Sequence, residues 1–263
     1  MKFVKTILIG CVTAVTLVAQ AEYEVTITFA NGSQRTVGEL VVQNGKVVLA
    51  KENLQVPFNQ LKELNFTFEE PLTAEECEIF IKRGAYDEML ARVDAFLEPV
   101  KNGLSLPGNL DLYIQYKMRA SFWLEKYDEA QASAQMLQSK NSSYASLAGL
   151  YEVLMLLEQE RSVDETKAAF DKISNPQDIS GVMTEYICGR LALAAYEYDE
   201  ALQYFSNVLV YHSRDPEWVP AATFYEGKLY KRTGLLESAS NIAEELEVAY
   251  PDSYWSGRAD ELN

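Results

Sequence analysis

The sequence predicts a mainly α-helical protein in which helix pairs stack into a right-handed solenoid behind a small N-terminal β module. Two observations support this fold class. Apolar residues recur with a period of two between residues 22 and 70, and with a helical period from Thr73 onward. In addition, the sequence Tyr-Asp-Glu-Ala begins at Tyr127 and again at Tyr198. Such a repetition is typical of a chain built from similar units in a row.

Length and composition indicate a folded protein with an acidic surface. The chain has 263 residues, of which 48% are hydrophobic, so there is material for a sizeable core. It contains 39 acidic and 23 basic residues. This balance argues against nucleic acid as a partner, because the phosphate backbone attracts basic surfaces.

The first 21 residues are typical of a secretory signal peptide. Lys2 and Lys5 precede an apolar run at residues 7–18, and Ala19-Gln20-Ala21 is a small-residue cleavage site. We therefore expect cleavage after Ala21 and a periplasmic or secreted protein. The apolar run is too short to span a bilayer, which needs roughly 20 residues, and no later segment is a candidate transmembrane span.

The alternative for this segment is a lipid anchor. Leu8-Ile9-Gly10-Cys11 loosely matches a bacterial lipobox, whose cysteine becomes lipidated. However, the apolar run continues past Cys11, which favours an ordinary signal peptide.

Residues 22–70 are predicted to form a small β domain of about five strands. The predicted strands are residues 23–29, 37–42, 46–50, 56–58 and 66–68. Asn44-Gly45 indicates a tight hairpin, because both turn residues readily adopt positive φ. Leu61 and Leu64 are predicted to lie on a single turn of helix. The order of strands resembles a small Sm-like or SH3-like barrel, and we interpret it as a cap or docking module.

The helical part begins close to Pro71, which disfavours helix before it. Thr73 and Glu76 have the spacing of a capping box, in which each side chain binds the other residue's backbone amide. The acidic residues Glu75, Glu76 and Glu78 fit the first turn of a helix, where negative charge is favourable, better than they fit a metal site.

The repeated motif marks the second helix of each predicted pair. Copies begin at Tyr86, Tyr127, Val163 and Tyr198, with a degenerate copy at Leu236, so the spacings are 41, 36, 35 and 38 residues. The Asp-Glu pair is favourable at a helix start. A small residue is expected twelve positions before the alanine of the motif, so that the two helices can approach closely, and Gly189 and Gly227 match this position.

Residues 73–263 are similar to the tetratricopeptide repeat (TPR) family, whose repeats are about 34 residues long. The last repeat matches best, with Gly227, Tyr230, Gly234, Ala239 and Pro251 at consensus places. The end of the chain resembles bacterial envelope TPR proteins such as the Tol–Pal periplasmic coordinator and the outer-membrane assembly lipoprotein. The Tol–Pal protein carries a coiled coil where this chain has strands. The resemblance implies about five helix-turn-helix repeats in residues 71–263.

Residues that could support catalysis or hold a cofactor are few. His212 is the only histidine, and we expect it in a loop near a helix C-terminus. Cys77 and Cys188 are expected at helix-packing positions three repeats apart, too distant for a disulfide. The sequence has no phosphate-binding loop and no Gly-x-Ser-x-Gly motif. We therefore predict that the protein is not an enzyme and has no metal or cofactor.

The resemblance to TPR proteins implies an inner groove lined by the first helix of each pair. The basic and aromatic residues placed there are Arg119, Phe122, Trp123, Tyr186, Arg190, Phe224, Lys228 and Arg232. Guanidinium groups and aromatic faces suit an extended, acidic peptide. The alternative is that these basic residues pair with acidic residues of the neighbouring repeat.

These patterns predict a non-catalytic scaffold or adaptor that mediates protein–protein interaction in cell-envelope assembly. The alternative is a structural subunit that self-assembles through the N-terminal β module.

Overall fold

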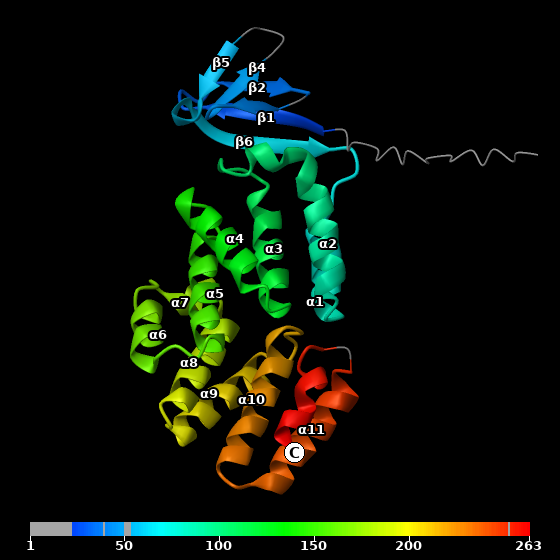
Figure 1. Cartoon of the computed structure of the whole chain (residues 1–263), viewed down its shortest axis with the longest axis vertical. Helices are drawn as coiled ribbons and strands as arrows, with labels where there is room; N and C mark the ends of the chain where they lie inside the picture. The colour runs from blue at the N-terminus through cyan, green and yellow to red at the C-terminus, as the bar shows by residue number, and fades with distance from the viewer. Residues whose placement is uncertain (1–22, 39, 50–53, 252) are drawn as a thin grey trace, which may run out of the picture.

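The computed structural model describes residues 23–38, 40–49, 54–251 and 253–263. The predicted signal peptide (residues 1–21) and the alternative lipid anchor at Cys11 lie outside the described residues. The protein is mainly helical, with two small antiparallel sheets near the N-terminus. Figure 1 shows these strands at one end of the long axis and the helical part extending from them to the other end.

The described part of the β module contains six short strands in two sheets. The first sheet has the order β2-β1-β6 and the second the order β3-β4-β5. Their inner faces form the core of the module, in which Val25, Ile27 and Val47 are fully buried. The strands are β1 (Tyr23–Phe29), β2 (Gln34–Val37), β3 (Val41–Gln43), β4 (Lys46–Leu49), β5 (Leu54–Pro57) and β6 (Leu61–Phe68).

The predicted Asn44-Gly45 turn is confirmed, since it joins β3 to β4 and both residues have positive φ, 50° and 71°. The strand predicted at residues 37–42 is divided, because β2 ends in the first sheet and β3 begins in the second. The helical turn predicted at Leu61 and Leu64 is wrong. A 3-10 turn, η2 (Phe58–Gln60), precedes them, and both leucines are buried in β6.

A change of register explains the error at Leu61 and Leu64. Leu64 lies opposite Ile27 and Leu61 lies opposite Phe29, with the pairing shifted between Thr28 and Phe29. A bulge adds one residue to a strand, so side chains three positions apart can both face the core. A spacing of three also fits one turn of helix, and therefore the sequence pattern alone does not separate the two structures.

The five copies of the motif each begin a helix, as predicted: α2, α4, α6, α9 and α11 start at Tyr86, Tyr127, Val163, Tyr198 and Leu236.

The capping box that starts α1 is also confirmed, since the Glu76 amide donates to Thr73 Oγ1 at 3.2 Å and the Thr73 amide to Glu76 Oε2 at 2.8 Å. The helices are α1 (Ala74–Lys82), α2 (Tyr86–Leu97), α3 (Asp111–Trp123), α4 (Tyr127–Ser139), α5 (Ala145–Glu158), α6 (Val163–Phe170), α7 (Pro176–Ile179), α8 (Gly181–Ala194), α9 (Tyr198–Tyr211), α10 (Trp218–Arg232) and α11 (Leu236–Ala249), with 3-10 helices η3 (Glu98–Gly103) and η4 (Ser256–Leu262).

The helix pairs α1–α2, α3–α4, α5–α6, α8–α9 and α10–α11 are joined by the same local turn. In each, a backbone amide after the first helix donates to a carbonyl five residues earlier, over 2.8–3.1 Å; the donors are Ala85, Lys126, Arg161, Glu197 and Leu235. The residue before each donor has positive φ, namely Gly84, Glu125, Glu160, Tyr196 and Gly234. This is the Schellman arrangement, which satisfies the last carbonyls of a helix.

The left-handed turn position offers a site for stabilisation. Glu160 is exposed and has φ 53°, a conformation that strains residues with a Cβ. We expect Glu160→Gly to raise the free energy of unfolding by about 0.5–1 kcal/mol. This value is the strain that glycine relieves in the folded state, reduced by the greater flexibility that glycine gives the unfolded chain. Urea titration measures the change. Gly234→Ala, at the equivalent turn, is the matched control and should lower stability, and a less stable Glu160→Gly protein would contradict the prediction.

The two glycines predicted at close helix contacts do lie at such contacts. A Cβ on Gly189 would lie 2.6 Å from the Phe205 ring of α9, and a Cβ on Gly227 would lie 2.7 Å from Leu262 of η4 and 2.8 Å from Ile242 of α11. Only a hydrogen atom fits at either position without displacement of its neighbours. The small residue therefore sets the distance between the helices of these pairs, as expected from the repeat.

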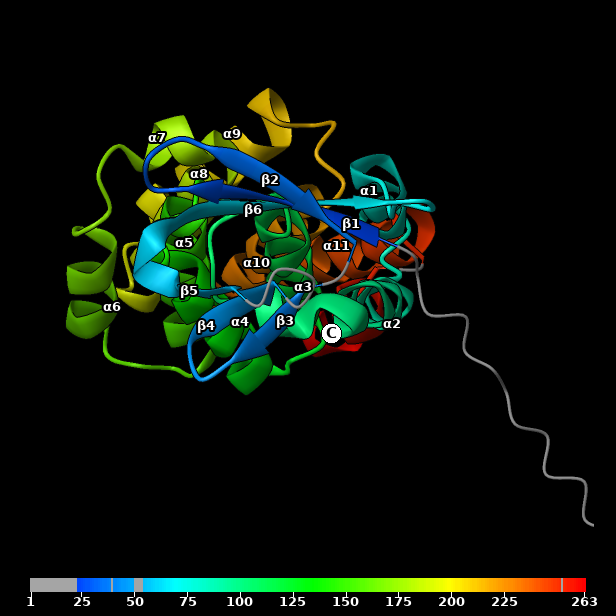
Figure 2. The same cartoon turned by 90° about the horizontal axis from the view of Figure 1, so that it is seen from above.

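The β module is fixed to the helical part by residues 104–110, which follow η3. The Leu64 amide donates to the Pro107 carbonyl at 2.9 Å. The Asn109 side chain both accepts from the Phe66 amide, at 2.9 Å, and donates to its carbonyl, at 2.7 Å. Below them, Phe68 packs on Phe96 of α2 with ring centroids 4.3 Å apart. One hydrophobic core therefore continues from the strands into the helices. Figure 2, seen from above, shows the helices directly behind the two sheets.

Candidate functional site

A buried carboxylate joins three of the helices on the inside of the helical part. Glu217, the residue before α10, is 6% exposed. Its Oε2 accepts from Arg119 Nη2 at 2.7 Å, while its Oε1 accepts from Trp123 Nε1 at 2.6 Å and from the Tyr151 hydroxyl at 3.0 Å. Arg119 and Trp123 belong to α3 and Tyr151 to α5. We call these four residues the Glu217 cluster.

The cluster is held in place by the local structure at the start of α10. Asp215 Oδ1 accepts the amides of Glu217, at 3.0 Å, and Trp218, at 2.9 Å, in the manner of a helix N-cap. Burial raises the pKa of the Asp215 carboxyl, although these amide hydrogen bonds oppose the shift. The capped turn fixes the Glu217 backbone, so that its side chain enters the space between α3 and α5.

Arg119 links the Glu217 cluster to the first helix. Arg119 Nη1 also lies 3.1 Å from Glu78 Oε1 of α1, so the guanidinium bridges two carboxylates. Burial alone would lower the pKa of Arg119, but the neighbouring acidic groups, Glu217 foremost, raise it well above its ordinary value. Burial, followed by the charge of Glu217, raises the pKa of Tyr151. Tyr151 therefore keeps its proton and remains a donor to the carboxylate.

A second basic centre lies between α8 and α10. Arg190 is 8% exposed, and its Nη1 donates to Glu158 Oε1 at 2.6 Å and to the Tyr186 hydroxyl at 2.9 Å. Its guanidinium lies 3.8 Å from the centroid of the Tyr225 ring, a cation–π contact. Lys228, one turn further along α10 from Phe224, lies 3.1 Å from Glu261 of η4.

The structure differs from the open basic groove that the sequence predicts. Five of the eight predicted groove residues are buried: Phe122, Trp123, Tyr186, Arg190 and Phe224. Arg119, Arg190 and Lys228 each pair with a carboxylate of another helix, as the alternative interpretation expected. Arg232 is exposed and donates to the Leu193 carbonyl at 3.4 Å. The expectation of an open surface was incorrect because Glu78, Glu158, Glu217 and Glu261 occupy the positions that a partner's carboxylates would take.

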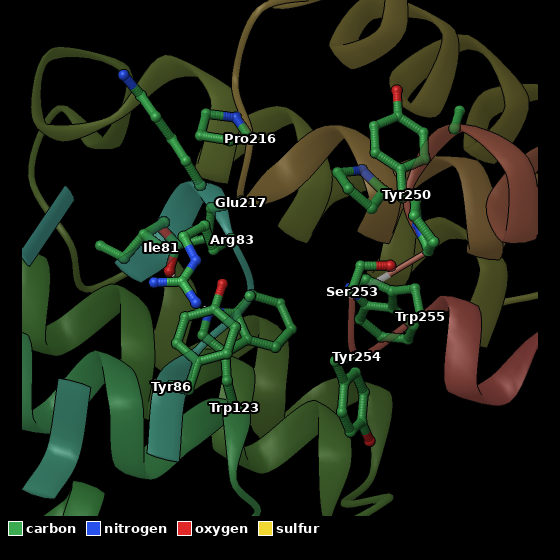
Figure 3. A pocket seen from close by; sticks show the side chains of 15 residues that line it. Ile81, Arg83, Tyr86, Trp123, Pro216, Glu217, Tyr250, Ser253, Tyr254 and Trp255 are labelled. Atoms are coloured by element: carbon green, nitrogen blue, oxygen red, sulfur yellow. Dashed lines mark hydrogen bonds between the residues drawn. The ribbon is translucent and has the colours of Figure 1, made fainter. Parts of the chain in front are cut away.

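A pocket of about 210 Å³ lies beside the Glu217 cluster, between the first helix pair and the C-terminal segment. We call it the terminal pocket. Figure 3 shows Tyr86 and Trp123 on one side of it and Tyr250, Tyr254 and Trp255 on the other. Its lining residues are Ile81, Lys82, Arg83, Gly84, Tyr86, Trp123, Pro216, Glu217, Pro220, Ala249, Tyr250, Pro251, Ser253, Tyr254 and Trp255.

Aromatic contacts hold the two walls of the terminal pocket together. The rings of Trp123 and Trp255 meet edge to face with centroids 5.8 Å apart, and Tyr86 stacks on Trp123 at 5.8 Å. The Tyr254 hydroxyl donates to Glu125 Oε1 at 2.5 Å. The terminal pocket is not predictable from sequence patterns, because its lining residues come from segments far apart in the chain. The only signal was the presence of Trp123 in the predicted groove.

The remaining candidate residues occupy structural positions. Cys77 is buried and Cys188 is half-buried, and neither forms a disulfide. Burial raises the pKa of both thiols to about 11, so both stay protonated and weakly nucleophilic at neutral pH. His212 is the C-cap of α9, as expected.

The described residues form neither a metal-binding cluster nor a membrane-spanning helix. In the part of the chain that the structure describes, no group of three or more His, Cys, Asp or Glu side chains is arranged to hold a metal ion. The helices described here are all too short or too polar to cross a bilayer.

Comparison with known proteins identifies no relative. No protein-family model matches the chain, and neither a curated protein nor a solved structure is significantly similar to it.

Proposed function

We propose that this chain is an exported, non-catalytic TPR scaffold or adaptor that binds other proteins in the cell envelope. One observation carries the proposal, namely the five helix pairs with the same turn and the same second-helix start. Stacked helix pairs of this kind form extended surfaces that serve mainly in recognition. The close glycine contacts in the last two pairs support the TPR interpretation further.

The β module fits the same proposal as a docked accessory unit. Its sheet orders β2-β1-β6 and β3-β4-β5, with a 3-10 turn between β5 and β6, support an SH3-like barrel. The hydrogen bonds of Leu64 and Phe66 to residues 107–109 occupy part of the outer edge of β6. Self-assembly through the β module, the alternative function, would therefore have to use another edge.

Export is proposed from the positive start, apolar run and cleavage site of residues 1–21. The proposal places the mature chain in the periplasm or outside the cell. Lipidation at Cys11 is the competing outcome for this segment.

In-cell cross-linking of the tagged full-length protein in its native cells, followed by mass spectrometry, tests the proposed function. We expect one or a few envelope proteins to be cross-linked reproducibly, and the mature N-terminus to be Glu22. Light scattering of the purified protein measures its oligomeric state. Cross-links only between copies of the chain, together with a stable oligomer, would favour the structural-subunit alternative. A lipid-modified N-terminus at Cys11 would contradict cleavage after Ala21.

A further inference from the structure

We propose that the terminal pocket binds the aromatic side chain of an extended, acidic protein segment. The inference rests on the proposed function, because it names the chemistry of the partner that a scaffold of this kind would recognise. It replaces the predicted groove as the place of binding, since three of the groove's four basic residues, Arg119, Arg190 and Lys228, are already paired with carboxylates of the chain.

The size of the pocket suits one ring. An apolar cavity of about 150 Å³ in another protein is large enough to bind benzene. The terminal pocket, at about 210 Å³, therefore has room for a phenyl, phenol or indole group. The terminal pocket is partly open to solvent, so a side chain can enter while its backbone stays outside.

The walls of the pocket favour an apolar occupant. They include the rings of Tyr86, Trp123 and Trp255 and the prolines Pro216 and Pro220. Aromatic pairs in edge-to-face or offset contact gain stability beyond that of area burial. The one carboxylate among the described lining residues, Glu217, already accepts hydrogen bonds on both oxygens. It therefore offers little attraction to a cationic or donor group.

Two basic residues at the end of α1, Lys82 and Arg83, line the terminal pocket. Lys82 forms no ion pair with a described residue. Arg83 lies 3.5 Å from Glu88, but both side chains are more than half exposed, and such pairs contribute little. Both cations are thus available to carboxylates that flank an aromatic residue in a bound segment.

The pocket is formed before any ligand arrives. Trp255, which forms one wall, is 2% exposed and is packed against Phe224 with ring centroids 4.8 Å apart. The opposite wall is fixed by the hydrogen bond from Trp123 to Glu217. A ligand therefore does not have to displace either wall, and binding loses little free energy to reorganisation.

Three small probes separate the requirements for the ring and for the charge. 3-Phenylpropionate carries both, propionate carries the charge alone, and phenethylamine carries the ring with the opposite charge. NMR titration of the purified protein follows the indole N–H signals of Trp123, Trp218 and Trp255. We expect 3-phenylpropionate to shift the Trp123 and Trp255 signals saturably, phenethylamine to bind about tenfold more weakly, and propionate to have no effect.

Three variants test whether the probe binds in the terminal pocket. Ala249→Trp adds a large group at an exposed lining position and should weaken 3-phenylpropionate binding at least about tenfold. Ala168→Trp, on an exposed face of α6, is the matched control and should bind normally. The double variant Lys82→Glu, Arg83→Glu should remove the preference for 3-phenylpropionate over phenethylamine. Absence of saturable shifts in the unaltered protein, or tighter binding of phenethylamine, would overturn the inference.

The same variants distinguish failure of the inference from failure of the proposed function. If Ala249→Trp loses the probe but keeps the cross-linked partner, the partner binds elsewhere. The scaffold function then stands, while the partner's recognition by the pocket is refuted. If the probe binds the pocket but no envelope protein is cross-linked to the chain, the proposed function fails and the pocket remains a ring-binding site.

Discussion

Replacing Glu217 with alanine should lower the free energy of unfolding by about 3–5 kcal/mol, the range for breaking a buried ion pair from one side. The substitution leaves Arg119, whose side chain is 14% exposed, with only the more exposed Glu78 as counter-ion. It also leaves the Trp123 indole N–H and the Tyr151 hydroxyl without their acceptor. Each unsatisfied buried donor adds roughly 1–3 kcal/mol to the cost when it stands alone. Urea titration followed by tryptophan fluorescence measures the change.

Two comparisons make the Glu217 prediction specific. Glu261→Ala removes a carboxylate from more exposed pairs with Lys228 and Arg258, and should cost about 1 kcal/mol or less. Glu217→Gln keeps an acceptor for Trp123 and should lie between the alanine variant and the unaltered protein. If Glu217→Ala and Glu261→Ala have equal effects, the Glu217 cluster does not join the helices in the way described.

Replacing Gly108 with alanine should destabilise the protein by about 3 kcal/mol, because the new methyl group overlaps backbone rather than a flexible side chain. A Cβ at this position would lie 1.8 Å from the Leu64 carbonyl oxygen and 2.9 Å from its carbon. Residues 107–109 must move away from β6 to relieve the overlap. The movement breaks the hydrogen bonds of Pro107 and Asn109 to β6.

Hydrogen exchange locates the effect of the Gly108 substitution. The amides of Leu64 and Phe66, which bond to residues 107–109, should exchange faster in Gly108→Ala, and helix α9 should be little affected. Gly38→Ala is the matched control, since a Cβ there meets no atom within 4 Å and the backbone is not left-handed. Unchanged protection of both amides would show that the β module does not depend on this contact.

The sequence predicted those features of the fold that depend on local signals. The starts of five helices, the capping box at Thr73 and the Asn44-Gly45 turn were all predicted correctly, because each depends on residues within one turn or one helix end. The errors have non-local causes. The bulge opposite Thr28 and Phe29 lets Leu61 and Leu64, which have a helical spacing, both face the core from one strand.

Less of the candidate site than of the fold could be predicted from the sequence. Some of the basic and aromatic residues of the predicted groove do contact one another, such as Arg119 beside Trp123 at Glu217 and Arg190 beside Tyr186. The prediction did not identify their acidic partners, because Glu217 lies 98 residues from Arg119 and outside any repeat position. These ion pairs allow the basic side chains to be buried. Such long-range pairs leave no periodic pattern in a single sequence.

The contact between the second helix pair and the C-terminal segment has a consequence for how the protein unfolds. In an open array of repeats each unit touches only its neighbours, so the terminal units fray first. Here Trp123 packs on Trp255, and Glu125 accepts a hydrogen bond from Tyr254, so residues near the two limits of the helical part support each other. The last pair can therefore separate only if contacts to the second pair break at the same time. Thermal unfolding of the helical part should then be a single cooperative transition, with the C-terminal residues protected almost as well as the centre.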